Sequence, residues 1–276
     1  MAINLAVKYS DYVDEIFTTQ AKRPLISNED YDWINAHTVK VYKVSTATMG
    51  NYDRAGSGTG VSRYGNIQGL NAVTEDMTLS KDRSFTYAID KLDEDETNGA
   101  LDAANSLARQ IREVIIPEVD THVISKMVAK AGKTITKAIT SSNVYTEIVA
   151  ATEELDNNEV PDTERVLMVN PSVYAKMKEN PSILMSTDVD AEARKMGVIA
   201  YIDGCTVIKV PAIRLGADVE FIMCHPSATV APIKLEDYKI HEDAPFINGS
   251  LVEGRVTYDA FVLDNKEHAI YVCKAK

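Results

Sequence analysis

The stretch that decides the fold spans residues 97–133 and reads TNGALDAANSLARQIREVIIPEVDTHVISKMVAKAGK. Apolar residues recur in its first half at steps of three or four, which places them on one face of a helix. That face holds Leu101, Ala104, Leu107, Ala108, Ile111 and Ile115. The acidic run at residues 93–96 and the lysines at 126, 130 and 133 suit the two ends of the helix dipole. The pattern predicts one long helix.

The length of this helix has a consequence for the shape of the subunit. Some 35 residues at a rise of about 1.5 Å each give a rod of roughly 50 Å, longer than a compact small domain is wide. Pro117 removes one backbone hydrogen bond and should bend the rod. We therefore expect an elongated subunit.

Two extended segments precede the helix and enclose a glycine-rich stretch. Residues 38–46 (TVKVYKVST) and 71–90 (NAVTEDMTLSKDRSFTYAID) alternate apolar and polar side chains, as half-buried strands do. Between them lies RAGSGTGV at 54–61. A phosphate-binding GxGxxG that starts at Gly56 would need glycine where Val61 stands, and a helix after the loop. Because a strand follows instead, we expect the glycines to form the pliable tip of a long β-arm.

The N-terminus predicts a second arm. Its apolar residues recur at roughly helical spacing, and acidic residues interrupt any run long enough for a signal peptide. The apolar positions are Ile3, Val7, Val13, Ile16 and Phe17. An amphipathic helix of this kind needs a partner surface.

Shorter helices and strands alternate after the long helix. The patterns predict a helix over 145–158, a strand within 164–171 and a helix over 172–180. Asp203-Gly204 predicts a hairpin turn between two short strands. Residues 234–244 and 249–274 are predicted to be strands, with a last turn at 264–266.

Composition and motifs exclude several classes of protein. The chain has 276 residues, 29 basic and 41 acidic, so its net charge of −12 disfavours direct binding to nucleic acid. No apolar run approaches the ~20 residues that span a bilayer. We expect no catalytic residue, no cofactor and no metal, because the histidines and carboxylates lack ligand spacing and no nucleophile motif occurs. The three cysteines should be buried, reduced thiols: Cys205, Cys224 and Cys273.

The order of elements resembles the major capsid protein of tailed bacteriophages, the Hong Kong 97-type fold. Six stretches carry the resemblance in order along nearly the whole chain. They are MAINLAVKYSDYVDEIF (1–17), VTEDMTLSKDRSFTYAIDKLD (73–93), RQIREVIIPEVDTHVI (109–124), RVLMVNPSVYAKMK (165–178), GVIAYIDGCTVIKVP (197–211) and VTYDAFVLDNKEHAIYV (256–272). Their specificity comes from their joint order, since none is a catalytic signature.

The resemblance implies an α+β fold of four parts. These are an N-terminal arm (1–36), an extended β-hairpin loop region (37–90), a peripheral domain with a spine helix (91–140 and 233–276) and an α/β axial domain (141–232). It also implies a shell subunit that forms pentamers and hexamers and closes into an icosahedral head around double-stranded DNA, without reading its sequence. Scaffold, portal and decoration proteins are the other partners it implies. The protein would assemble in the bacterial cytoplasm and reside in the virion, with no role for a membrane.

The resemblance assigns contacts between subunits to both arms. At the extended-loop tip these are Tyr52, Arg54, Gly56, Gly58, Gly60, Arg63 and Tyr64. At the N-terminal arm they are the five apolar residues named above. Some members of the fold cross-link chains through a lysine on this loop, but the glycine tip has Arg54 and Arg63 and no lysine, so we do not infer a cross-link.

Three other interpretations remain open from the sequence. The first keeps the fold and makes the protein an encapsulin-like compartment shell with an enzyme cargo. The second is a small-molecule enzyme or binding module built on residues 145–232, and it lacks a supporting motif. The third is a phage tail component, which the long helix flanked by β-arms disfavours.

Overall fold

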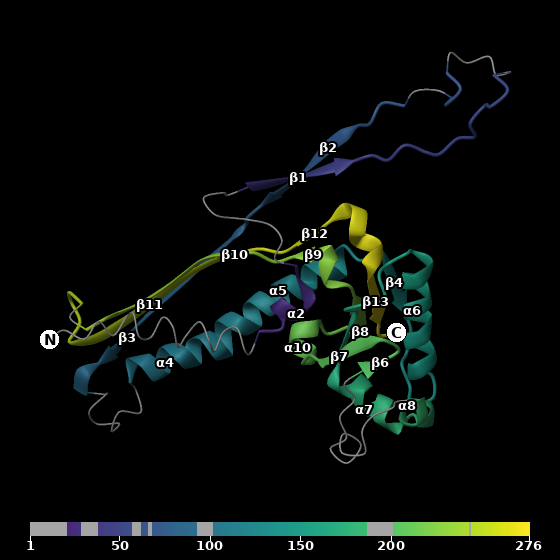
Figure 1. The fold of residues 1–276 in the computed structure, drawn as a ribbon. Helices are drawn as coiled ribbons and strands as arrows, with labels where there is room; N and C mark the ends of the chain where they lie inside the picture. Colours follow the sequence, from purple (N-terminus) through teal and green to yellow (C-terminus); the bar gives the residue numbers. More distant parts are fainter. Residues whose placement is uncertain are drawn as a thin grey trace. The chain divides into compact units, whose positions relative to one another are not determined.

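The chain forms two compact units in the computed structural model, Asn35–Leu79 and a larger one made of Met1–Ile34 with Ser80–Lys276. The structure describes residues 21–28, 38–56, 62–65, 68–92, 102–186, 201–242 and 244–276. The larger unit contains a long helix, a three-stranded sheet and a six-stranded sheet (Figure 1). The smaller unit contains a two-stranded hairpin.

The long helix consists of α4 (Ala103–Gln110), a π-helical turn (Ile111–Ile115) and α5 (Ile116–Ala129). The Asp102 carboxylate accepts a hydrogen bond from the Asn105 backbone N–H at 3.0 Å and so caps the start. Pro117, which has no N–H to donate, follows the π turn directly. The helix exists as predicted, but it begins at Ala103 rather than at residue 97 and ends at Ala129, so its length is about 40 Å.

Close backbone packing ends the helix early. The N–H of Gly132 donates to the carbonyl of Glu267 at 2.9 Å. A Cβ at Gly132 would lie 2.5 Å from the Cα of His268, so only glycine fits. The chain therefore leaves the helix before residue 133 and enters strand β4 (Lys133–Thr136).

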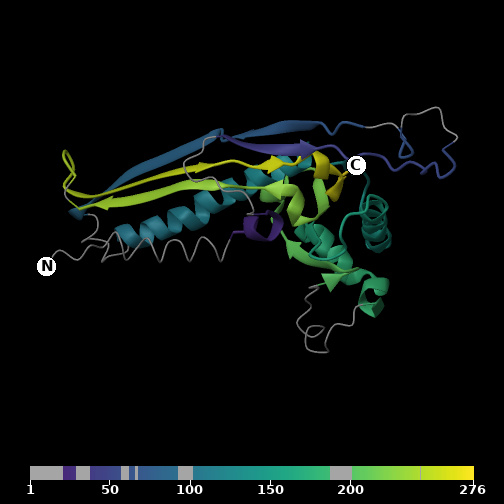
Figure 2. The ribbon, with the colours of Figure 1, turned by 45° about the horizontal axis from the view of Figure 1, so that its top comes forward.

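The three-stranded sheet has the order β10 (Ile233–His241), β11 (Gly249–Tyr258) and β3 (Lys81–Asp90), all antiparallel. It runs alongside the long helix (Figures 1 and 2), and α4 packs against β11. Gly254 lies where Phe85 and Tyr238 meet across the sheet, and a Cβ there would come within 2.5 Å of the Phe85 ring. Of the closing strands, β11 thus pairs with β3, and β10 pairs with β11.

The six-stranded sheet is mixed, with the order β4-β13-β8-β5-β7-β6. Its further strands are β13 (Ile270–Lys274), β8 (Val219–Cys224), β5 (Val166–Val169), β7 (Cys205–Lys209) and β6 (Tyr201–Ile202). All four residues of β5 are buried, so this central strand forms the middle of the core. The turn at Asp203-Gly204 joins β6 to β7 with positive φ at both residues, which confirms the predicted hairpin.

Four helices lie around this sheet, and two of them are predicted from the sequence. The predicted ones are α6 (Val144–Asn157) and α7 (Pro171–Glu179), whereas α8 (Pro181–Ser186) and α10 (Ala212–Leu215) were not predicted. α6 packs against β13 and α7, and α10 packs against α5. The Asn170 side chain caps α7 by accepting a hydrogen bond from the Ser172 N–H at 3.0 Å.

The last predicted turn takes the form of a 3-10 helix. Residues 264–266 belong to η3 (Asp264–Ala269), which connects two strands of different sheets. β12 (Phe261–Val262) pairs with β9 (Thr229–Val230), whereas β13 joins β8 and β4. The six-stranded sheet therefore contains strands from both sides of residue 232.

The smaller unit is an antiparallel hairpin of β1 (Thr38–Val44) and β2 (Ala72–Thr78), with Thr38 opposite Thr78 and Val44 opposite Ala72. The sequence predicts one continuous extended segment over 71–90. The structure divides it into β2 and β3, which lie in different sheets. The β1–β2 ladder ends at the pair of Thr38 and Thr78, and the backbone N–H of Ser80, between β2 and β3, donates to the carboxylate of Asp259 at 2.8 Å.

Candidate functional site

The predicted loop tip lies at the end of the β1–β2 hairpin. The structure describes Tyr52, Arg54, Gly56, Arg63 and Tyr64, while Gly58 and Gly60 lie outside the described residues. The rings of Tyr52 and Tyr64 meet edge to face with their centroids 5.0 Å apart, and both side chains are exposed. The Asp53 N–H donates to the Arg63 carbonyl at 2.9 Å. The segments on the two sides of the tip are therefore joined by a backbone hydrogen bond and a ring contact, and their aromatic side chains are exposed to solvent.

Gly56 has a local reason to be glycine. Its φ of +67° lies in the left-handed region, and its N–H donates to the Asp53 carboxylate at 2.8 Å. Farther from the tip, Ser45 and Asn71 exchange two hydrogen bonds at 2.9 Å and continue the β1–β2 ladder toward the loop. The loop returns into strand β2 and not into a helix, which is the element that a phosphate-binding loop needs next.

One face of the hairpin is exposed and partly apolar. Tyr42 and Val44 project from the same face of β1, with Thr74 and Ala72 opposite them in β2. Tyr42 is 72% exposed and Val44 is 60% exposed. A two-stranded hairpin is marginal in water by itself, so a partner on this face would stabilise it.

The predicted contacts of the N-terminal arm lie outside the described residues, namely Ile3, Val7, Val13, Ile16 and Phe17. The structure shows how the segment after them is anchored. The buried carboxylate of Asp120 in α5 accepts hydrogen bonds from the backbone N–H groups of Lys22 and Arg23, and the Arg214 guanidinium lies 3.3 Å from it. Burial raises the pKa of Asp120 above its usual value despite these partners. The short helix α2 (Arg23–Ile26) is thereby fixed to the long helix.

A second buried carboxylate joins the long helix to the β3 and β11 strands. Asp259 accepts hydrogen bonds from the His122 ring, the Ser80 N–H and the Ala260 N–H, each at 2.8 Å. Burial alone would raise the pKa of Asp259, but these hydrogen bonds outweigh it and hold the pKa below its usual value. The cluster is a structural junction with no nucleophile in it.

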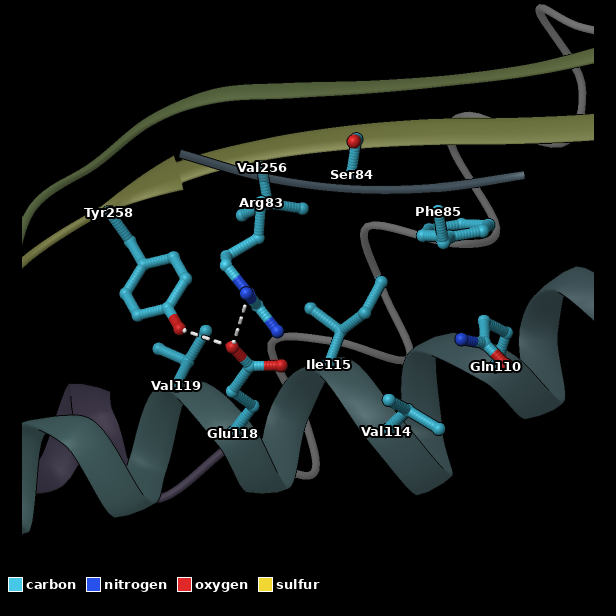
Figure 3. A pocket seen from close by; sticks show the side chains of 10 residues that line it. All are labelled: Arg83, Ser84, Phe85, Gln110, Val114, Ile115, Glu118, Val119, Val256 and Tyr258. Carbon is cyan, nitrogen blue, oxygen red and sulfur yellow. Dashed lines mark hydrogen bonds and ion pairs between the residues drawn. The ribbon is translucent and has the colours of Figure 1, made fainter. Parts of the chain in front are cut away.

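A cavity of about 130 Å³ lies between β3, β11 and the long helix (Figure 3). Most of its wall is apolar: Phe85, Val114, Ile115, Val119, Val256 and the ring of Tyr258. At one end, the Tyr258 hydroxyl and the Arg83 guanidinium both donate to Glu118 at 2.9 Å (Figure 3). Burial, with Glu118 adding to it, raises the pKa of Tyr258, so this hydroxyl stays protonated. The cavity suits an apolar group.

The titratable groups of the described residues do not form a catalytic arrangement. The three cysteines are free and buried, as predicted, and burial raises the pKa of Cys205 to about 11 and those of Cys224 and Cys273 to about 12. Thiols with such values are poor nucleophiles near neutral pH. In the described part of the chain, no group of three or more His, Cys, Asp or Glu side chains is placed to hold a metal ion. Likewise, none of the described helices combines the length and apolar character needed to cross a membrane.

Known structures resemble this fold over almost its whole length. A chain of Mycobacterium phage Che8 matches with a TM-score of 0.75 and 20% identity, over 92% of this chain and 91% of that one. The mature capsid of bacteriophage PhiM1 matches with a TM-score of 0.66 and 13% identity, over 91% and 84%. A virus-like particle from Pyrococcus furiosus matches with a TM-score of 0.62 and 12% identity, over 98% and 100%.

No protein family model matches the sequence, and no curated protein resembles it closely enough to match. The chain therefore shares a mixed helix-and-sheet fold with phage capsid structures at a level of identity that shows the fold alone.

Sequence reasoning missed Asp120, Asp259 and the cavity. The two aspartates look like ordinary polar positions in the sequence, because each gains its role from partners about 100 or more residues away along the chain. The cavity is invisible for the same reason, since its walls come from three segments. Phe246 was also missed, although its neighbour Pro245 could have drawn attention to a turn.

Proposed function

We propose that this protein is the major capsid protein of a tailed bacteriophage, a structural subunit and not an enzyme. The observation that carries the proposal is the match to phage structures, which extends over nine-tenths of both chains for Che8. The absence of a catalytic arrangement among the described residues is consistent with this proposal.

The proposed assembly is of the Hong Kong 97 type, with pentamers and hexamers that close into an icosahedral shell. In this proposal residues 1–36 are the N-terminal arm and 37–90 the extended loop region. Residues 91–140 with 233–276 form the peripheral domain, and residues 141–232 form the axial domain. The exposed face of Tyr42 and Val44 and the tip with Tyr52 and Tyr64 then cover a neighbouring copy.

The proposed content of the shell is double-stranded DNA. A net charge of −12 per subunit suits a wall that encloses DNA without gripping it, because affinity for the phosphate backbone comes mainly from Lys and Arg. Scaffold, portal and decoration proteins are proposed partners. Assembly would take place in the cytoplasm of the bacterial host and the product would be the virion.

Assembly of the purified chain tests the proposal. We expect pentamers, hexamers or closed shells by analytical ultracentrifugation and negative-stain microscopy. Replacing residues 50–69 by four glycine or serine residues keeps the β1–β2 ladder, including the Ser45–Asn71 pair, and should abolish or distort the shells while the subunit still folds. A chain that remains a monomer or dimer at high concentration would contradict the proposed function.

A compartment shell with an enzyme cargo is a second candidate. The match to the virus-like particle from Pyrococcus furiosus favours it, because that match covers all of the other chain. The content of particles isolated from their natural source distinguishes the two functions. Nuclease-protected double-stranded DNA supports the phage head, whereas a single co-purifying enzyme supports the compartment.

A further inference from the structure

We propose that Phe246 of one copy inserts into the cavity between β3, β11 and the long helix of a neighbouring copy. The inference rests on the proposed function, since it names residues that join two subunits of the shell. It is carried by two features of the chain that fit each other, a projecting phenyl ring and an apolar cavity of matching size.

Phe246 has a strained backbone conformation and a fully exposed side chain. It lies in the turn between β10 and β11, in which the Ile247 N–H donates to the Ala244 carbonyl at 3.4 Å. Pro245 and a positive φ at the next residue are the pattern of a type II turn, whose third position normally requires glycine or asparagine. Here Phe246 occupies that position at φ +73° with its side chain fully exposed. Such strain persists where it serves a function, and an exposed ring gains nothing in the isolated subunit.

The cavity has the size and lining that a phenyl ring requires. Its volume of about 130 Å³ is close to that of the ~150 Å³ protein cavity known to bind benzene. Val119, Val256 and Tyr258 are nearly fully buried in its wall, and Val114, which also lines it, is 44% exposed. Glu118 and the Tyr258 hydroxyl already bond to each other, so a tyrosine hydroxyl that entered here would gain little from them. This favours Phe246 over the exposed tyrosines of the chain.

Phe246 cannot reach the cavity of its own chain. In the β11–β3 ladder, Gly249 pairs with Asp90 near the turn, whereas Val256 pairs with Arg83 beside the cavity. Seven residues at about 3.3 Å each separate these two points by roughly 23 Å. The occupant is therefore a second copy. Because the ring and the cavity are different surfaces, the contact runs head to tail, which is the kind of contact that closes into rings.

Cysteine cross-linking tests the contact directly. In the double variant Phe246→Cys with Val114→Cys, mild oxidation of assembled shells should give covalent multimers on a non-reducing gel, since the native cysteines are buried. The matched control pairs Val114→Cys with Ile213→Cys, a residue of α10 that is 86% exposed, and should stay monomeric on the gel. Shells without covalent multimers would overturn the inference but leave the proposed function standing. A wild-type chain that forms no shells would instead overturn the proposed function.

A second variant covers the case in which the cysteines prevent assembly. Phe246→Gly suits the positive φ, so the urea midpoint of the unassembled subunit should not fall. Loss of a buried phenyl group should nevertheless weaken each contact by roughly ten- to hundredfold, which raises the protein concentration needed for assembly. If Phe246→Gly assembled at the lowest protein concentration at which the wild type assembles, the proposed contact would be refuted.

Discussion

Replacing Asp259 by alanine should destabilise the subunit more than any surface change. Its side chain is 2% exposed, and the substitution removes the acceptor of the hydrogen bonds from His122, Ser80 and Ala260. Water can replace the bond to exposed Ser80, but the Ala260 N–H is buried and His122 is nearly so. Leaving a buried donor without its acceptor costs about 1–3 kcal/mol, and here two buried donors lose the same carboxylate. The urea midpoint of the unassembled subunit, followed by circular dichroism, should therefore fall by roughly 1–2 M.

The pH dependence gives this prediction a second measurement. The pKa of Asp259 is lowered in the folded state, so its contribution to stability is present above the unfolded value of about 3.9 and is lost as the pH falls through the folded value. Asp259→Asn keeps one acceptor oxygen and does not titrate. Its stability should fall less than that of the wild type between pH 5 and pH 2, measured by the same urea titrations at each pH.

A surface carboxylate provides the control for both measurements. Asp264 bonds to Lys130 at 2.7 Å, but both side chains are nearly half exposed. Asp264→Ala should change the unfolding free energy by less than about 1 kcal/mol. If Asp259→Ala proved no more destabilising than this control, Asp259 would not hold the β3 and β11 strands to the long helix.

Three further outcomes follow from individual contacts. Gly132→Ala should lose roughly 3 kcal/mol of unfolding free energy, since its Cβ would meet the His268 backbone at 2.5 Å, whereas Gly50→Ala has open space and should change it by less than about 0.5 kcal/mol. Asp120→Asn should unfold at a higher urea concentration than Asp120→Ala. Because burial raises the pKa of Asp120, this group's contribution to stability is full below about pH 3.9 and is lost as the pH rises through the folded value, a dependence that Asp120→Asn should lack. In the native subunit at pH 8, a thiol reagent should modify none of the three cysteines within the time that labels the urea-unfolded chain completely.

Local patterns were sufficient to predict most of the elements. The buried strand β5, helix α7 with its Asn170 cap and the Asp203-Gly204 hairpin are each encoded within about ten neighbouring residues. The long helix was predicted from its apolar face, but its ends were misplaced. Gly132 is a local stop signal close to the end at Ala129, but the reason that only glycine fits there is the approach of the Glu267 backbone, 135 residues away along the chain.

The division of the extended segment at residue 80 has the same origin. The alternation of apolar and polar residues continues from 71 to 90, so the sequence favours one strand. In the structure β2 and β3 lie in different sheets, and between them the Ser80 N–H donates to the buried carboxylate of Asp259, which is 179 residues away along the chain and leaves no local signal. For the loop tip, the sequence predicted the pliable glycines but not the contact between Tyr52 and Tyr64, because that contact depends on how the two legs pair.

Phe246 stands out because its side chain conflicts with the backbone conformation that its turn position requires. A type II turn after Pro245 favours glycine, and glycine would remove both the backbone strain and an exposed phenyl ring. Residues that break a local rule without a gain in the isolated chain are expected at functional positions. Gly56 is the opposite case. Glycine adopts its positive φ without strain, and the hydrogen bond from its N–H to Asp53 within the same loop accounts for the conformation. Both residues have a positive φ, which glycine adopts without strain. Phe246 adopts it with an exposed phenyl ring, and the proposed contact with a second copy gives that ring a role.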